Sequence, residues 1–221
     1  CELREQEGAG KRKRHEREGR KGPYPEIPLY TAKDASASFP QFSAVGYEEV
    51  VQLGEGIEAT FHDAGHVLGS SMVKVKISQN GEQRILVFSG DVGRWEKPML
   101  HDPTIFEEAD YILVESTYGD RLHEDQKGIE ATLVEIINST RKRGGNIVIP
   151  SFAFERAQEI LYYLNELLLQ DRIPHLLVFL DSPMATSITE VFERYPDLLD
   201  EDMVELMRQK KSPFDFPGLK I

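Results

Sequence analysis

Three apolar runs between Phe61 and Arg121 constrain this chain more than any other feature. Each run is rich in β-branched residues, and each ends in or precedes a polar residue set in a turn of small residues: His66, Asp91 and Glu115. A strand that buries apolar residues and stops at a flexible loop can present one imidazole or carboxylate at the edge of a sheet. The three residues are therefore candidates for a metal site or an acid–base site.

Each of these three residues also has a purely structural interpretation. His66 lies between Gly65 and Gly69, which allow a tight turn that aims the imidazole outward, yet a lone histidine is more often a hydrogen-bonded residue than a ligand. Asp91 equally suits an Asx turn. Glu115 follows four apolar residues and should be partly desolvated, so a buried salt bridge is its alternative.

Composition bounds the class of protein. The chain has 221 residues, 40% of them hydrophobic, and none of its apolar runs reaches the roughly 18 residues that a membrane span needs. We expect a soluble, cytoplasmic protein without a membrane partner. Cys1 is the only cysteine, so any metal would be held by histidines and carboxylates. The net charge of -12 disfavours nonspecific adhesion to nucleic acid, although bound divalent metals could supply a local positive field.

The N-terminal segment is predicted to be an arm followed by a linker. Residues 1–22 carry a basic cluster from Lys11 to Lys21, which is either a nucleic-acid-contacting arm or a solvated helix end or loop. Interleaved glutamates favour the second interpretation. Prolines predict an extended linker at residues 23–28. Thr31 is predicted to cap a short helix that ends near Pro40.

The next part of the chain is predicted to be a β-meander. Its expected strands are residues 44–46, 48–53, 57–62, 72–77 and 83–88. Gly54-Glu55-Gly56 is predicted to be a tight turn, and Asn80-Gly81 is the strongest hairpin signal in the chain.

Beyond Glu115 the pattern changes to helices alternating with short strands. The expected helices are residues 128–142, 154–169 and 185–195, and the expected buried strands are 146–149 and 176–180. This alternation predicts a parallel α/β unit. We place a domain boundary near residue 122, between a β-rich part (1–122) and an α/β part (123–221).

The order of several motifs is similar to that of one known family. G-H-V-L-G-S (65–70), S-G-D-V-G-R (89–94) and E-S-T-Y-G-D-R (115–121) follow one another, with P-L-Y-T-A-K-D-A (28–35) before them. After them come I-P-S-F-A-F-E-R-A-Q-E-I-L-Y-Y-L (149–164), L-D-S-P-M-A-T-S-I-T-E (180–190) and P-F-D-F-P-G-L-K (213–220). The chain resembles the metallo-β-lactamase fold in the branch that carries the β-CASP insertion, which includes RNA-processing ribonucleases. The resemblance implies an α/β fold, with part of an αββα metallo-β-lactamase domain in 1–122 and part of a β-CASP domain with parallel strands in 123–221.

The resemblance also implies roles for the three candidates. His66 corresponds to a metal-binding histidine, Asp91 to a carboxylate that bridges two zinc ions, and Glu115 to an acidic residue that orients a histidine near the leaving group. The implied activity is two-zinc hydrolysis of RNA phosphodiesters, and a homodimer is one open possibility. Substrate phosphates are expected in a cleft between the two domains.

Three further residues are expected to face that cleft: Ser151, Arg156 and Ser182. Hydroxyls at helix N-termini and an arginine suit phosphate oxygens. Helix capping or a surface ion pair accounts for each of them equally well.

The chain also departs from the family pattern. The main metal motif, H-x-H-x-D-H, has no counterpart here, and the two downstream histidines that complete the site are not found. His62 precedes His66 by four residues but lies in a predicted strand, His123 could contact the surroundings of Glu115, and Glu155 stands where many relatives have glycine. We expect an interior piece of a longer enzyme, with little hydrolysis of its own. The alternatives are an inactive scaffold subunit and a small-molecule hydrolase of the same superfamily.

Overall fold

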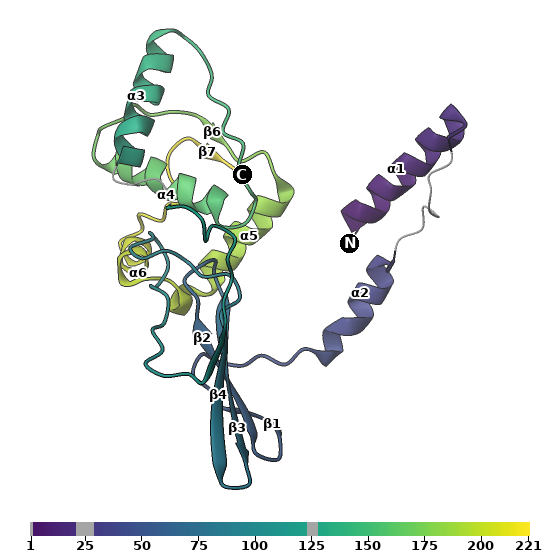
Figure 1. Ribbon diagram of the computed structural model, residues 1–221. Helices are drawn as coiled ribbons and strands as arrows, with labels where there is room; N and C mark the ends of the chain where they lie inside the picture. The colour runs from purple at the N-terminus through teal and green to yellow at the C-terminus, as the bar shows by residue number, and fades with distance from the viewer. Residues whose placement is uncertain (1, 21–28, 123–127) are drawn as a thin grey trace. The chain divides into compact units, whose positions relative to one another are not determined.

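The computed structural model describes residues 2–20, 29–122 and 128–221 (Figure 1). It divides into two units, Cys1–Val45 and Gly46–Ile221. The predicted linker at residues 23–28 and the candidate His123 lie outside the described residues. Among the residues described, no helix combines the length and the apolar character needed to cross a bilayer.

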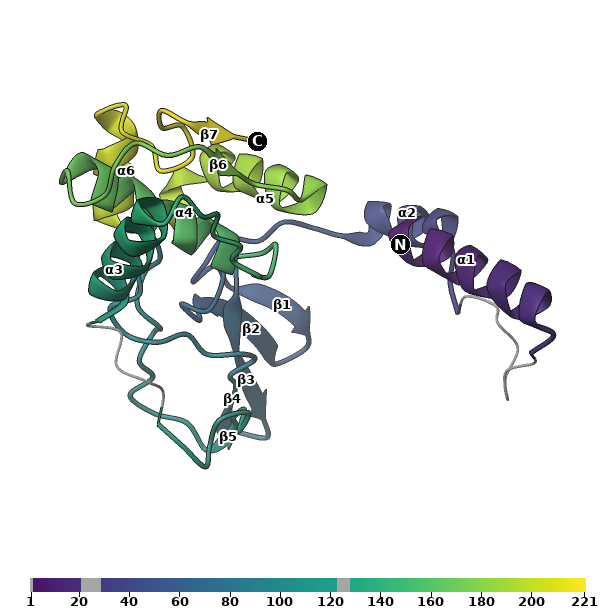
Figure 2. The same ribbon diagram turned by 90° about the horizontal axis from the view of Figure 1, so that it is seen from above.

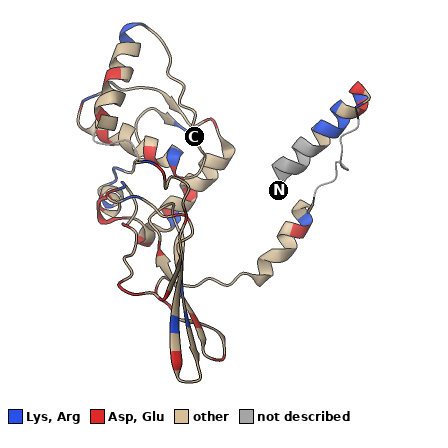
Figure 3. Ribbon diagram, viewed as in Figure 1, with Lys and Arg blue, Asp and Glu red and all other residues tan. Residues whose placement is uncertain are grey.

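The first unit consists of short polar helices. Helix α1 spans Glu2–Glu18, α2 spans Ala32–Ser38, and a 3-10 turn, η1, spans Phe39–Gln41. In the second half of α1, Lys and Arg residues are followed by acidic residues toward the C-terminal end of the helix (Figure 3). The predicted cap of α2 is confirmed: the Asp34 N–H donates to Thr31 Oγ1 at 3.2 Å, and the Thr31 N–H donates to the Asp34 carboxylate at 2.8 Å. This reciprocal pair is a capping box.

The second unit begins with a five-stranded sheet in the order β1-β2-β3-β4-β5 (Figure 2). Its strands are β1 Val51–Gly54, β2 Ile57–Asp63, β3 Ser71–Gln79, β4 Glu82–Phe88 and β5 Tyr111–Leu113. The first four are antiparallel and β5 runs parallel to β4. The predicted hairpin is confirmed, with Asn80 and Gly81 both at positive φ (54° and 81°), as a two-residue hairpin turn requires.

The first predicted strands are wrong in part. Residues 44–46 form no strand, and β1 begins at Val51 rather than at Glu48. Glu48 has a φ of 61° and lies in a turn, with its N–H donating to Phe61 O at 2.8 Å. A residue in the left-handed region interrupts extended backbone, so the strand can start only after it.

Helices make up most of the remainder of the second unit. They are α3 Ile129–Lys142, α4 Arg156–Leu169, α5 Pro183–Arg194 and α6 Glu201–Arg208, with a 3-10 turn, η3, at Pro196–Leu198. Strands β6 Val178–Phe179 and β7 Leu219–Lys220 pair in parallel. The predicted helices α3, α4 and α5 are confirmed within two residues at each end, whereas α6 and β7 were not predicted.

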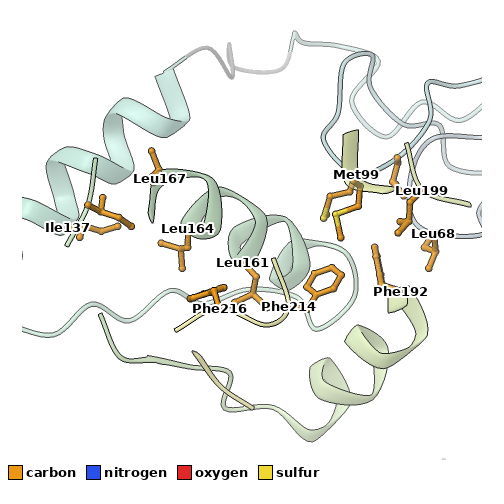
Figure 4. Close-up of a cluster of buried hydrophobic side chains, with 13 residues drawn as sticks. Leu68, Met99, Ile137, Leu161, Leu164, Leu167, Phe192, Leu199, Phe214 and Phe216 are labelled. Carbon is orange, nitrogen blue, oxygen red and sulfur yellow. The ribbon is translucent and has the colours of Figure 1, made fainter. Parts of the chain in front are cut away.

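The main core is built around α4 and extends to two loops of the sheet. Leu161, Leu164 and Leu167 of α4 are buried in one cluster (Figure 4). Its other buried members are Ile137, Ile173, Phe192, Met203, Phe214, Phe216, Leu68, Met99, Leu100 and Leu199. Because Leu68 follows β2 and Met99 follows β4, the helices pack directly on the loops that carry the candidate residues.

Two segments predicted to be buried are exposed. Residues 146–149 form no strand, and Val148 is 87% exposed; the run from Tyr111 to Val114 is exposed by half or more at every residue. The buried strand predicted at 176–180 shrinks to the two residues of β6, and the prediction of burial is wrong there too, because Leu177 and Phe179 are exposed. In the described part of the chain no layer packs over these apolar side chains, so the expected burial does not occur. The boundary near residue 122 stays a prediction.

Candidate functional site

The loop that carries His66 joins β2 to β3 and is shaped by local hydrogen bonds. Gly65 and Gly69 both have positive φ, 59° and 78°. Ser70 Oγ accepts from the His66 N–H at 3.1 Å and from the Val67 N–H at 3.2 Å. The glycines permit a turn that other residues would strain, and the Ser70 hydroxyl then fixes the His66 backbone.

The loop that carries Asp91 follows β4 and lies against the His66 loop. The Gly93 N–H donates to Ala64 O at 2.7 Å. A Cβ on Gly93 would lie 1.8 Å from Gly65 O, so only glycine allows this approach of the two backbones. The result is that His66 Nε2 lies 3.9 Å from Asp91 Oδ2.

Glu115 is bound to the Asp91 loop through both backbone and side chain. Its N–H donates to Ser89 Oγ at 3.0 Å, while its carboxylate accepts from the Val92 N–H at 2.6 Å and from the Thr117 hydroxyl at 2.7 Å. The Thr117 hydroxyl first, and then the Val92 N–H, hold the pKa of Glu115 below its ordinary value, with a smaller contribution from His66. The predicted desolvation is present but is outweighed by these donors.

The three principal candidates therefore lie together at the ends of β2, β4 and β5. The side chains of His66 and Asp91 are 45% and 73% exposed, so both are open to a ligand. One imidazole nitrogen and one carboxylate make a donor pair that suits zinc or a harder cation. Within residues 2–20, 29–122 and 128–221, however, three or more His, Cys, Asp or Glu side chains nowhere gather as a metal site would need. His66 and Asp91 fit part of such a site.

His62 points to a different environment. It lies in β2, as predicted, so it forms no helix-spaced pair with His66. Its Nε2 is 2.9 Å from Thr60 Oγ1, and its ring meets Phe106 edge-on at 4.9 Å. Burial lowers the pKa of His62. The contacts of its ring with Thr60 and Phe106 give this residue a structural role in the sheet.

The three residues expected to contact phosphate lie at or just before the first turn of a helix. Two of them, Ser182 and Arg156, bind other groups of the protein. Ser182 caps α5 and accepts from the Ala185 N–H at 3.2 Å. Arg156 is the first residue of α4, and its Nη1 lies 2.7 Å from Glu159 Oε2. Ser151 is exposed in the segment before α4. Their contact with substrate stays a prediction.

A buried ion pair beside His66 was not predicted. Lys97 Nζ lies 3.0 Å from Glu155 Oε1, with the two side chains only 10% and 6% exposed. Burial raises the pKa of Glu155, and the Lys97 ammonium opposes this shift. The one sequence signal comes from the family resemblance described above, which implies glycine at this position in many relatives; a glycine position often requires positive φ. Glu155 indeed has a φ of 66°.

Comparison with known proteins identifies the class to which this site belongs. Residues 157–221 match the Beta-Casp domain. The chain is 37% identical over 194 residues to ribonuclease TTHA0252 of Thermus thermophilus, covering 88% of this chain and 43% of that protein. It is 34% identical over 203 residues to transcription termination factor FttA of Methanosarcina mazei (90% and 30%), and 33% identical over 198 residues to endoribonuclease ysh1 of Schizosaccharomyces pombe (87% and 25%).

These matches confirm the family resemblance. The chain belongs to the β-CASP branch of the metallo-β-lactamase fold, and its mixed α/β architecture with a mainly antiparallel sheet agrees with that assignment. It spans less than half the length of the three relatives described above. Nucleases of this family are metal-dependent.

Proposed function

We propose that the protein is a metal-dependent phosphodiester hydrolase that acts on RNA and uses two zinc ions. The observation that carries the proposal is the meeting of His66, Asp91 and Glu115 at one edge of the sheet, with His66 Nε2 and Asp91 Oδ2 3.9 Å apart. The names of the relatives, a ribonuclease and an endoribonuclease among them, support RNA as the substrate.

The residues of this chain would divide the work as follows. His66 and Asp91 would hold metal together with further ligands. Bound zinc supplies Lewis acidity toward a phosphodiester. Glu115 keeps its charge because two donors stabilise the carboxylate, so it can orient a protonated imidazole beside the reacting phosphate.

Substrate phosphates would lie near the start of α4 and α5. Arg156 is the first residue of α4, Ser182 is the N-cap of α5, and Ser151 precedes α4. Helix N-termini and guanidinium groups attract phosphate oxygens. We assign the three residues to this role as part of the proposal.

The test uses the intact protein as its gene encodes it. Metal analysis should find about two zinc ions per chain, as expected of a two-metal site, and a 5′-labelled RNA should be cut. Asp91→Ala should remove cutting and reduce bound zinc while the circular dichroism spectrum stays that of the wild type.

Two other results would redirect the assignment. A wild-type protein that binds RNA but carries no zinc and cuts nothing would be a scaffold subunit. Hydrolysis of a small thioester or lactone without any cutting of RNA would indicate a small-molecule hydrolase. Either result would overturn the proposal.

A further inference from the structure

Glu155 occupies a backbone conformation that glutamate rarely adopts. Its φ and ψ are 66° and -55°, and the Arg156 N–H donates to Phe154 O at 2.8 Å across it. This is the geometry of a γ-turn with positive φ, a rare and strained turn. A strained residue of this kind persists only when its surroundings hold it there.

The Glu155 side chain is held by two groups that both belong to, or contact, the His66 loop. One carboxylate oxygen lies 3.0 Å from Lys97 Nζ, and the same ammonium donates to His66 O at 2.7 Å. The other oxygen accepts from the Leu68 N–H at 3.3 Å. The backbone is thus held at the two peptide groups that flank Val67, the first of which carries the His66 carbonyl.

These contacts are enclosed by protein. Lys97 and Glu155 are almost completely buried, and Leu68 belongs to the core around α4. A buried ion pair often adds little to global stability compared with an apolar pair of the same size. Its effect on the position of the loop is a separate matter, because both of its ends are hydrogen-bonded to fixed backbone atoms.

We infer that Lys97 and Glu155 are positioning residues that fix the His66 backbone from the N-terminal end of α4. The pair links the start of α4 to the loop that carries His66, so the position of this loop depends on that of the helix. The Beta-Casp match begins in the same helix. If the backbone turned at His66 or Leu68, one of the two attachments would break. The consequence for metal binding rests on the proposed function, whereas the restraint on the loop does not.

Four variants of the intact protein test this inference. Glu155→Gln and Lys97→Met each remove one charge. Glu155→Gly removes the carboxylate and also relieves the turn, since glycine accepts positive φ freely. The double variant K97M/E155L removes both charges and so leaves no unpaired buried ion. Glu130→Gln is the matched control, because Glu130 pairs with Arg172 and links α3 to the segment after α4.

The first readout is amide hydrogen exchange, which needs no metal. We expect exchange at residues 66–70 to rise about tenfold or more in all four variants, because a lost restraint lowers the local opening free energy. Exchange in β3 and β4 should stay unchanged, and Glu130→Gln should match the wild type throughout. K97M/E155L keeps the test valid if a variant that leaves one buried charge unpaired fails to fold.

The second readout is zinc affinity, measured by competition with a chelator. Supporting residues around metal ligands typically change affinity by about 10–100-fold, and we expect a loss at the lower end of that range in the four variants only. Wild-type exchange at residues 66–70 in the variants would overturn the restraint. Faster exchange with unchanged zinc affinity would overturn the positioning role. A wild-type protein that binds no zinc would refute the proposed function, and the exchange readout would still decide the restraint.

Discussion

Gly93 and Ala64 are joined by a 2.7 Å hydrogen bond between the Gly93 N–H and Ala64 O, which holds the Asp91 loop against the His66 loop. The two loops are far apart in the sequence, and each carries one candidate ligand. Their backbones can approach because Gly93 has no side chain. The geometry of the candidate site therefore depends on a residue that has no side chain with which to bind metal.

Replacing Gly93 by alanine should displace one of these loops. A Cβ would lie 1.8 Å from Gly65 O and 2.7 Å from the His66 N, whose N–H donates to Ser70 Oγ. We expect Gly93→Ala to lower the free energy of unfolding by about 2 kcal/mol or more, in the range of severe backbone clashes. Urea unfolding measures this loss.

Gly128→Ala is the control for the Gly93 variant. A Cβ on Gly128 would meet no atom within 4 Å, and its φ of -102° suits any residue. Its stability should stay within about 0.5 kcal/mol of the wild type. Equal stabilities for the two variants would contradict the packing described here.

Glu115 should make stability depend on pH in the acid range. Its folded pKa lies below its ordinary value of 4.5 because the Thr117 hydroxyl and the Val92 N–H stabilise the carboxylate. Such a group adds stability that is fully present above the unfolded pKa and is lost as the pH falls through the folded pKa. Glu115→Gln should therefore flatten the curve of unfolding free energy against pH on the acid side of the ordinary pKa of 4.5. Parallel curves for the two proteins would show that Glu115 gains nothing from these donors.

Ser182 allows capping and substrate contact to be separated. Ser182→Ala should cost about 0.5–2 kcal/mol of stability, because α5 loses its side-chain cap. Ser182→Asp keeps a good cap but adds a negative charge, which would repel a phosphate. If Ser182 contacts substrate, the aspartate variant should bind RNA more weakly while keeping its thermal stability. If both properties match the wild type, Ser182 is a cap alone.

Gln158 ties α4 to α5 from a fully buried position. Its Nε2 donates to Thr189 Oγ1 at 3.0 Å and to Ala185 O at 3.3 Å. Gln158→Leu keeps the volume but removes the donor, and should cost about 1–3 kcal/mol. Gln52→Leu on exposed β1 should change stability by less than about 0.5 kcal/mol. A loss as small for Gln158 as for Gln52 in urea unfolding would refute the importance of this link.

Sequence reasoning succeeded where the signal is local. Asn80-Gly81 determines a hairpin through the conformations of two residues, and Thr31 with Asp34 caps α2 within one helical turn. The convergence of His66, Asp91 and Glu115 could also be anticipated, because each residue follows a strand. The three strands β2, β4 and β5 run in the same direction in one sheet, so they end at the same edge.

Sequence reasoning failed where the structure depends on contacts between residues that are far apart in the sequence. The Glu155 carboxylate accepts a hydrogen bond from the Leu68 N–H, 87 residues away in the sequence, and no pattern near either residue predicts that contact. The burial predicted for Tyr111–Val114 assumed a covering layer, which local composition cannot supply. Glu48 interrupts a strand by one backbone angle that its residue type does not favour.

The exposed run at β5 affects how the chain can be handled. Tyr111–Leu113 pairs with β4 on one side, and in the described part of the chain it is the last strand of the sheet. Its side chains, with Val114, expose apolar surface. Unpaired strand edges with apolar side chains recruit further strands and favour aggregation. We therefore expect the isolated 221-residue polypeptide to precipitate on concentration, and a lysine at Ile112 to keep more of it in solution.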